Sequence, residues 1–418
     1  MDGGLGDGQR ESMGLNRISS KMAACSPLPA VLLILFLSDC GVRILGAGVG
    51  INYGRVADNL LDPDHVVSLI RSLSISRVKL YDADAAVLRA FAGTGVEFIV
   101  EIGNGELSRV AASEDDAIAW VRQNVKPFLP QTRITTIAVG NEVLAGKDTS
   151  GIAPYLLPAM KSLYTALADL RLTGQLSVTT AHSMDVLGTS FPPSAGRFRP
   201  DIDPYIKPLL DFHAQIGSPF LVNAYPFFAY KASPQQASLA YALFQPNPGM
   251  TDPGSKLRYD NMLYAQIDAV YSAIRAAGHG GIEVRVSETG WPSAGDADEH
   301  GASPANAAVY NGNLMRRTQA QQSTPGHPSS PVDVHLFALF NEDLKPGPAS
   351  ERNYGLLHPN GTPVYALGQQ PPGFLMEISA SPARSEGSNH LLCLCAAVVF
   401  FLATAAATDG APCEFSNR

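Results

Sequence analysis

Cysteine is missing from most of this chain. Residues 48–381 of the 418 contain none. The five that exist all lie in or beside two hydrophobic segments near the ends: Cys25, Cys40, Cys393, Cys395 and Cys413. A disulfide scaffold, a cysteine-based zinc site and a thiol nucleophile are therefore excluded for the long central stretch. A chain of this length does not need disulfides, because it can bury enough surface in one large core.

Excess positive charge and familiar cofactor motifs are also missing. The formal net charge of -8 provides no basic surface for nucleic acid and suits an uncharged or cationic partner better. No cluster has metal-ligand spacing. The turn GINYGRVADN (residues 50–59) lacks the GxGxxG pattern of dinucleotide sites. We therefore expect no metal, no cofactor and no nucleic-acid partner.

Long hydrophobic runs occur only near the two ends. The run LPAVLLILFL (residues 28–37) is too short to span a bilayer and fits the core of a signal peptide. Beyond this run, Leu45-Gly46-Ala47 supplies small residues for cleavage before Gly48. We expect residues 1–47 to be a signal peptide and the chain to be secreted. Because Met22 would give a leader of ordinary length, residues 1–21 are interpreted as a possible upstream extension.

The second run, LLCLCAAVVFFLATAAA (residues 391–407), follows a small-residue triplet and a polar spacer. This order indicates a glycolipid-anchor signal. We expect attachment at Ser379, within a linker of residues 371–390, and interpret residues 391–418 as a hydrophobic C-terminal propeptide. The polar residues 408–418 are unusual for such a tail, so a short transmembrane helix stays an alternative.

Both readings of the tail place the central region outside the cell. Asn360 begins a glycosylation sequon, Asn-Gly-Thr, which is compatible with that location. The following Pro363 would reduce its use.

Strand-like and helix-like stretches alternate between the terminal segments. Apolar, β-branched runs predict eight strands, at residues 49–54, 77–82, 97–104, 134–142, 176–183, 220–228, 283–292 and 334–342. Amphipathic spacing predicts helices among them, at residues 115–125, 155–170 and 261–278. Eight strands alternating with helices favour a single (β/α)8 TIM barrel over residues 48–370. An open doubly wound sheet is the less favoured alternative.

Polar and aromatic residues collect where these predicted strands end. They are Tyr53, Asp82, Asn104, Asn141, Glu142, His182, Asn223, Tyr225, Glu288, Trp291 and Glu342. Barrel enzymes carry their chemistry at the carboxyl ends of the strands, so this clustering predicts one site. Cleavage of a glycosidic bond needs one carboxylic acid and one carboxylate, and Glu142 and Glu288 can fill these roles. Asn141 can bind a sugar 2-hydroxyl.

Aromatic and amide side chains suit a sugar-binding cleft, because sugar rings stack on aromatic rings and their hydroxyls take hydrogen bonds. The candidates are Tyr53, Asn223, Tyr225, Phe228 and Trp291. Trp120 lies on a helix-like segment and is expected in the core, and Phe227 stays unassigned. A single histidine such as His182 is more often structural than substrate-binding.

Five strings resemble a known family. GINYGRVADNL, VGNEV, VNAYPFFAY, VSETGWPS and FNEDLKPGPASERNYGL are similar to the plant β-1,3-glucanases, the glucan endo-1,3-β-glucosidases of glycoside hydrolase family 17. The resemblance covers about residues 48–368. It implies a retaining (β/α)8 barrel with an acid/base glutamate after the fourth strand and a nucleophile after the seventh. On this sequence these are Glu142 and Glu288.

The resemblance also implies supporting roles near the reaction centre for Glu342 and Lys345. We expect Lys345 to lower the pKa of a nearby carboxylate, and an ordinary surface ion pair is the alternative for these two residues. Asp343 is the one visible departure, because asparagine is more common there. In a retaining enzyme the two carboxyl groups lie about 5 Å apart and share one proton.

The resemblance implies endo-hydrolysis of β-1,3-glucan such as callose. The enzyme would be a cofactor-free monomer on the plasma membrane and in the cell wall. Transglycosylation and cleavage of mixed 1,3-1,4-glucan stay open, because both use the same two carboxylates. A protein that binds glucan without cutting it is a further alternative, although both glutamates are present.

Overall fold

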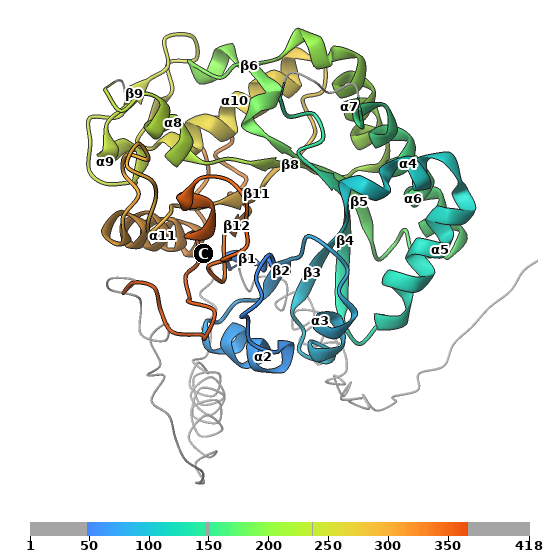
Figure 1. The fold of residues 1–418 in the computed structure, drawn as a ribbon. Helices are drawn as coiled ribbons and strands as arrows, with labels where there is room; N and C mark the ends of the chain where they lie inside the picture. Colours follow the sequence, from blue (N-terminus) through green and yellow to red (C-terminus); the bar gives the residue numbers. More distant parts are fainter. Residues whose placement is uncertain (1–47, 147–150, 236, 367–418) are drawn as a thin grey trace, which may run out of the picture. The chain divides into compact units, whose positions relative to one another are not determined.

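The computed structural model describes residues 48–146, 151–235 and 237–366 (Figure 1). The expected signal peptide, the anchor linker with Ser379 and the C-terminal segment lie outside the described residues. Within the described ranges, none of the helices has both the length and the apolar character that crossing a membrane requires.

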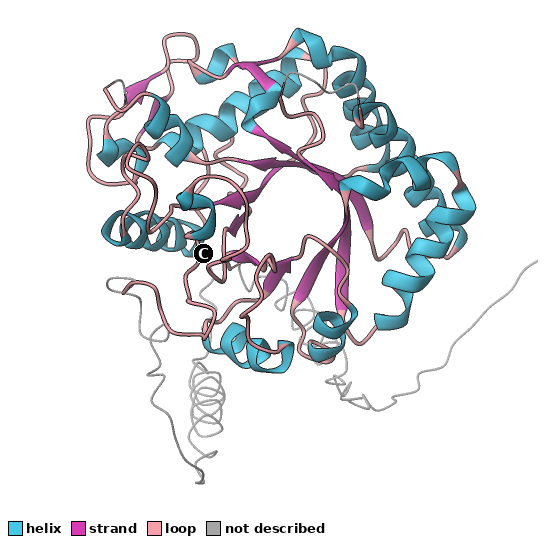
Figure 2. Cartoon of the chain, in the orientation of Figure 1, coloured by secondary structure: helices cyan, strands magenta, loops and turns pink. Residues whose placement is uncertain are grey.

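Eight parallel strands close into a barrel, which Figure 2 shows as a ring inside a layer of helices. In chain order they are β1 (Gly50–Asn52), β2 (Arg77–Lys79), β3 (Glu97–Ile102), β4 (Arg133–Asn141), β5 (Ser177–Ser183), β8 (Phe220–Asn223), β11 (Val284–Thr289) and β12 (Val334–Leu336). The ring closes where β1 pairs with β12, with Gly50 opposite His335. The prediction of a (β/α)8 barrel is confirmed, and each predicted strand is present. The strand predicted at residues 220–228 is shorter than expected, because residues 226–228 begin a helix.

Helices follow the strands and cover the outside of the ring. They are α2 (Pro63–Ser72), α3 (Ala85–Ala90), α4 (Leu107–Ala112), α5 (Glu114–Asn124), α6 (Ala153–Asp169), α7 (Asp203–Ile216), α8 (Pro226–Ala232), α9 (Leu239–Ala242), α10 (Met262–Ala276) and α11 (Pro304–Gln319). The three helices predicted from amphipathic spacing correspond to α5, α6 and α10. Several of these helices are capped at their N-termini by a side chain. In α5, for example, the Ser113 side chain accepts a hydrogen bond from the Asp116 amide.

Short elements in the connecting loops were not predicted. Two antiparallel pairs, β6 (Leu187–Thr189) with β7 (Arg197–Phe198) and β9 (Met250–Thr251) with β10 (Arg258–Tyr259), follow β5 and β8. Single 3-10 turns are η2 (Asn104–Glu106), η3 (Lys126–Phe128), η4 (Met184–Val186), η5 (Pro193–Ala195), η6 (Pro200–Ile202) and η7 (Ala349–Arg352). Runs of two to four residues carry too little periodicity to be recognised in a sequence.

The core fills the space between the ring and the helices. Trp120, on α5, is buried there as expected, and the unassigned Phe227 is fully buried on α8. Asn360 lies in an exposed turn where its side-chain oxygen accepts hydrogen bonds from the Thr362 amide (3.0 Å) and hydroxyl (2.7 Å). Glycosylation at Asn360 stays a prediction.

The close packing at the end of β11 can be tested at Gly290. A methyl group at this position would overlap the carbonyl oxygen of Phe337, which is backbone and cannot rotate away. We predict that Gly290→Ala lowers the free energy of unfolding by about 1–3 kcal/mol, the usual cost of overpacking. Gly312 in α11 is the matched control, because a methyl group there meets no atom within 4 Å apart from its own helix backbone. Gly312→Ala should raise stability by about 0.5–1 kcal/mol. Equal denaturation midpoints for the two variants would contradict this account.

Candidate active site

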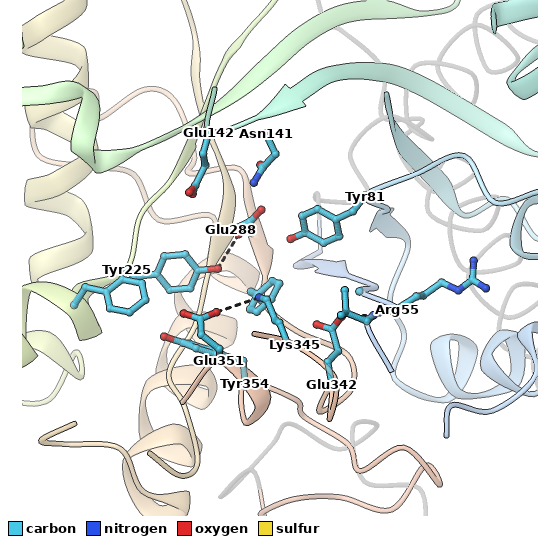
Figure 3. Close-up of a pocket in the computed structure, with 14 residues that line it drawn as sticks. Arg55, Tyr81, Asn141, Glu142, Tyr225, Glu288, Glu342, Lys345, Glu351 and Tyr354 are labelled. Carbon is cyan, nitrogen blue, oxygen red and sulfur yellow. Dashed lines mark hydrogen bonds and ion pairs between the residues drawn. The ribbon is translucent and has the colours of Figure 1, made fainter. Parts of the chain in front are cut away.

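A pocket of about 400 Å³ lies where several barrel strands end (Figure 3). Most of the predicted site residues line it: Asn141, Glu142, Tyr225, Phe228, Glu288, Glu342 and Lys345. Arg55, Tyr81, Phe337, Glu351 and Tyr354 also line it and were not predicted. The carboxyl ends of the strands therefore do gather acidic, basic and aromatic groups in one place, as barrel enzymes require.

The backbone turns sharply at the end of β4 and points Glu142 into this pocket. Gly140 and Glu142 both have left-handed φ values, +67° and +55°. For a residue other than glycine this conformation costs about 1–3 kcal/mol and persists only where the surroundings fix it. Here the Glu142 amide donates to the Ala181 carbonyl (2.9 Å). The Asn104 side chain exchanges two hydrogen bonds of 2.9 Å with the Asn141 backbone.

The surroundings of Glu142 favour its protonated form. Burial raises the pKa of Glu142, and the neighbouring Glu288 carboxylate raises it further. Asn223 opposes this, because its amide donates to Glu142 Oε1 (2.8 Å), and the charges of Lys79 and Lys345 also lower the pKa. The net shift is upward, so Glu142 can hold a proton for a departing oxygen.

Glu288 lies in a different environment at the end of β11. Its Oε1 is 3.1 Å from the ammonium of Lys79, and its Oε2 accepts a hydrogen bond from the Tyr225 hydroxyl (2.9 Å). Burial, followed by the Glu288 charge, raises the pKa of Tyr225 well above its usual range, so the hydroxyl stays a donor. A cation and a donor on its two oxygens suit an ionised carboxylate.

Glu342 and Lys345 reach the pocket from the segment after β12. Glu342 is only 3% exposed, and its Oε1 accepts a hydrogen bond from the Val56 amide (2.8 Å). Lys345 lies 3.3 Å from Glu351 and 4.1 Å from the centre of the Phe337 ring. The two residues thus do not form the ordinary surface ion pair considered above. As expected, the charge of Lys345 acts to lower the pKa of both Glu142 and Glu342, although burial leaves both raised.

Two aromatic residues expected in the cleft lie elsewhere, which corrects the sequence interpretation. Trp291 is fully buried, its ring packs against Phe227 on α8 and Tyr310 on α11, and its indole donates to the Gly301 carbonyl. Tyr53 is 2% exposed and packs edge-on against Phe340. Regular alternation ends with the strands, so the pattern did not fix the direction of side chains beyond β1 and β11.

Two other residues at the predicted strand ends, Asn223 and His182, do not line the pocket. Asn223 is 2% exposed and contacts Glu142 and Asn141 instead of open space. Ser287 donates to its side-chain oxygen (2.7 Å), which fixes the amide orientation. His182 is fully buried and stacked on Phe220, and burial lowers its pKa to about 3, so it is a neutral structural group.

The sequence interpretation missed Lys79 and Glu101, which are buried on β2 and β3 and lie 3.5 Å apart. A signal did exist, because each charge stands between apolar residues, in VKL for Lys79 and in FIVEI for Glu101. Among the described residues, no group of three or more His, Cys, Asp and Glu side chains could hold a metal ion.

Comparison with known proteins places this geometry among glycosidases. The model of the family "Glycosyl hydrolases family 17" matches residues 49–368. The chain is 56% identical over 348 residues to glucan endo-1,3-beta-glucosidase 14 of Arabidopsis thaliana, covering 83% of this chain and 88% of that protein. It is 52% identical over 340 residues to glucan endo-1,3-beta-glucosidase 11 of the same plant, covering 80% and 79%.

A solved structure shows the same architecture. CJP38, a β-1,3-glucanase and allergen of Cryptomeria japonica pollen, superimposes with a TM-score of 0.73 at 42% identity. The match covers 77% of this chain and 98% of that one.

Because Glu288 and Asn223 act in opposite directions on the pKa of Glu142, removing each should shift that pKa in opposite directions. Glu288→Gln should lower the pKa of Glu142, because it removes a negative charge that raises it. Asn223→Ala should raise that pKa further, because it removes a hydrogen bond to the ionised form. The measurement is a pH titration of the Glu142 side-chain carbon by NMR in the three proteins. Shifts of the same sign in both variants would contradict the assignment.

Proposed function

Because the chain belongs to glycosyl hydrolase family 17, we propose that it is a retaining endo-β-1,3-glucanase acting on glucans such as callose. The observation that carries the proposal is the pair of glutamates in one pocket. Glu142 has a raised pKa, whereas Glu288 lies against an ammonium group. Carboxyl groups with such different surroundings suit the separate roles of acid and nucleophile.

The reaction follows from these roles. Glu142 protonates the departing glycosidic oxygen while Glu288 attacks the anomeric carbon, which forms a covalent glycosyl-enzyme. Glu142, now ionised, then takes a proton from water, and the water oxygen displaces Glu288. Phe228, which lines the pocket and is 42% exposed, would stack on a sugar ring, and Asn141, which also lines it, would bind a 2-hydroxyl. One chain contains the complete pair of glutamates, which supports action as a monomer.

The location proposal rests on the sequence alone. Residues 1–47 would direct secretion, and residues 380–418 would be exchanged for a glycolipid attached at Ser379. The enzyme would then act at the outer face of the plasma membrane and in the cell wall, where a polysaccharide substrate lies. Support comes from the order of small residues, polar spacer and apolar run.

The nucleophile assignment is tested by Glu288→Gln on a linear β-1,3-glucan oligosaccharide. The variant keeps the shape of the side chain but cannot form the glycosyl ester, so we expect turnover to fall on the order of 10⁴-fold or more. Binding of the oligosaccharide should be largely retained. Glu283→Gln is the matched control, because Glu283 is exposed just before β11 and its loss should leave activity unchanged. Near-normal activity in Glu288→Gln would sink the assignment.

Product analysis of the wild type in the same experiment separates the alternatives. Shorter oligosaccharides mean endo-hydrolysis. Products longer than the substrate would mean that the enzyme is a transglycosylase. Binding without any product would mean that the protein binds glucan without cutting it.

The anchor is tested with a phosphatidylinositol-specific phospholipase on membranes that carry the protein. We expect the enzyme to move to the soluble fraction, and a Ser379→Pro variant with a blocked attachment site to be absent from the membrane beforehand. Retention of the wild-type protein on treated membranes would favour a spanning tail instead.

A further inference from the structure

A lysine is fully buried beneath the candidate nucleophile. Lys79, the last residue of β2, is 0% exposed. Removing an ammonium group from water is expensive unless partners replace the water. Its partners are Glu288 Oε1 at 3.1 Å, Glu101 Oε2 at 3.5 Å and the face of the Tyr81 ring at 3.8 Å.

The contact between Lys79 and Glu288 crosses the inside of the barrel. In the ring, β2 and β11 are separated by β1 and β12, whereas β3, which carries Glu101, is the direct neighbour of β2. The ammonium group therefore links one adjacent strand to one distant strand. Within a buried environment such a pair is electrostatically much stronger than it would be in water.

We propose that Lys79 is a positioning residue of the glycosidase reaction, which holds Glu288 ionised and oriented for attack and is itself kept in place by Glu101. The proposal rests on the function proposed above. Lys79 does not line the pocket, so it acts through Glu288 rather than on the sugar. Tyr225 holds the second oxygen of Glu288, and the two contacts together fix the plane of the carboxylate.

At acidic pH most titratable groups near Lys79 are neutral, so Glu288 is the main negative partner of the Lys79 ammonium group. Glu101 is 5% exposed, and burial raises its pKa to about 7, so it is largely protonated below that pH. His335 on β12 is neutral, because burial lowers its pKa to about 3. The hydroxyls of Tyr81 and Tyr225 stay protonated, since burial raises their pKa values well above the usual range. The charge of Lys79 also acts to lower the pKa of Glu142, but burial leaves that pKa raised.

The test compares pH profiles of kcat/KM for the wild type and Lys79→Met, which has a similar shape and no charge. The acidic limb of this profile marks the pH at which the free enzyme loses activity because a group that must be ionised gains a proton. Without the ammonium group we expect this limb to move up by about one pH unit, so that kcat/KM on the limb falls about tenfold. An unchanged limb would overturn the proposal.

A double variant separates positioning from a structural role. In Lys79→Met the Glu101 carboxyl is left buried without its cation, which destabilises the protein. Adding Glu101→Gln removes that carboxyl, so stability should recover while the acidic limb stays displaced. Recovery of both would show that Lys79 is structural only.

The matched control is Arg77→Met on the same strand. Arg77 lies two residues before Lys79, hence on the same side of β2, but pairs with Asp333. We expect Arg77→Met to have lower thermal stability than the wild type. Its acidic limb should lie at the same pH as that of the wild type, unlike the limb of Lys79→Met. A displaced limb in Arg77→Met would contradict a specific role for Lys79.

A substrate-free measurement keeps this inference separate from the proposed function. The NMR resonance that disappears in Glu288→Gln identifies the Glu288 carboxyl carbon in the full protein. In Lys79→Met this carboxyl should gain its proton at a higher pH than in the wild type, and an equal midpoint would overturn the proposal. If the wild type fails to cleave β-1,3-glucan, the proposed function fails, but this titration still decides the role of Lys79.

Discussion

Closure of the parallel barrel is the constraint on which the rest of this structure depends. All eight strands run in the same direction, so their carboxyl ends meet on one face, and residues far apart in the sequence become neighbours. Glu142 directly follows the fourth strand and Glu288 is next to last in the seventh, yet both line one pocket. The same closure carries Lys79 across the inside of the ring to Glu288. Neither contact could arise within a single strand and its adjacent helix.

The site gains its chemistry through local arrangements that are costly for the fold. Glu142 has a left-handed backbone, and Lys79 is an ammonium group without access to water. Each is maintained by specific partners, the Asn104 and Ala181 contacts for the first and the side chains of Glu101 and Glu288 for the second. These arrangements give two glutamate side chains, Glu142 and Glu288, different surroundings. One glutamate can then act as an acid while the other stays a carboxylate.

The parts of this structure that were predictable depend on repeated patterns. Long apolar runs identified the eight strands, and a carboxylate at the end of a run identified Glu142 and Glu288. The directions of Trp291 and Tyr53 were not predictable, because alternation stops where the strand stops and tertiary packing then decides. Lys79 and Glu101 were missed for another reason. Their charges stood out in apolar strands, but only barrel closure reveals the partners that make burial possible.

Proton NMR of the first product formed from a linear β-1,3-glucan oligosaccharide tests the central claim most directly. A covalent intermediate on Glu288 requires two displacements at the anomeric carbon, so the newly formed reducing end should appear first as the β-anomer. Slow mutarotation would then produce the α-anomer. Initial appearance of the α-anomer would mean that water attacks directly, and it would contradict Glu288 as the nucleophile.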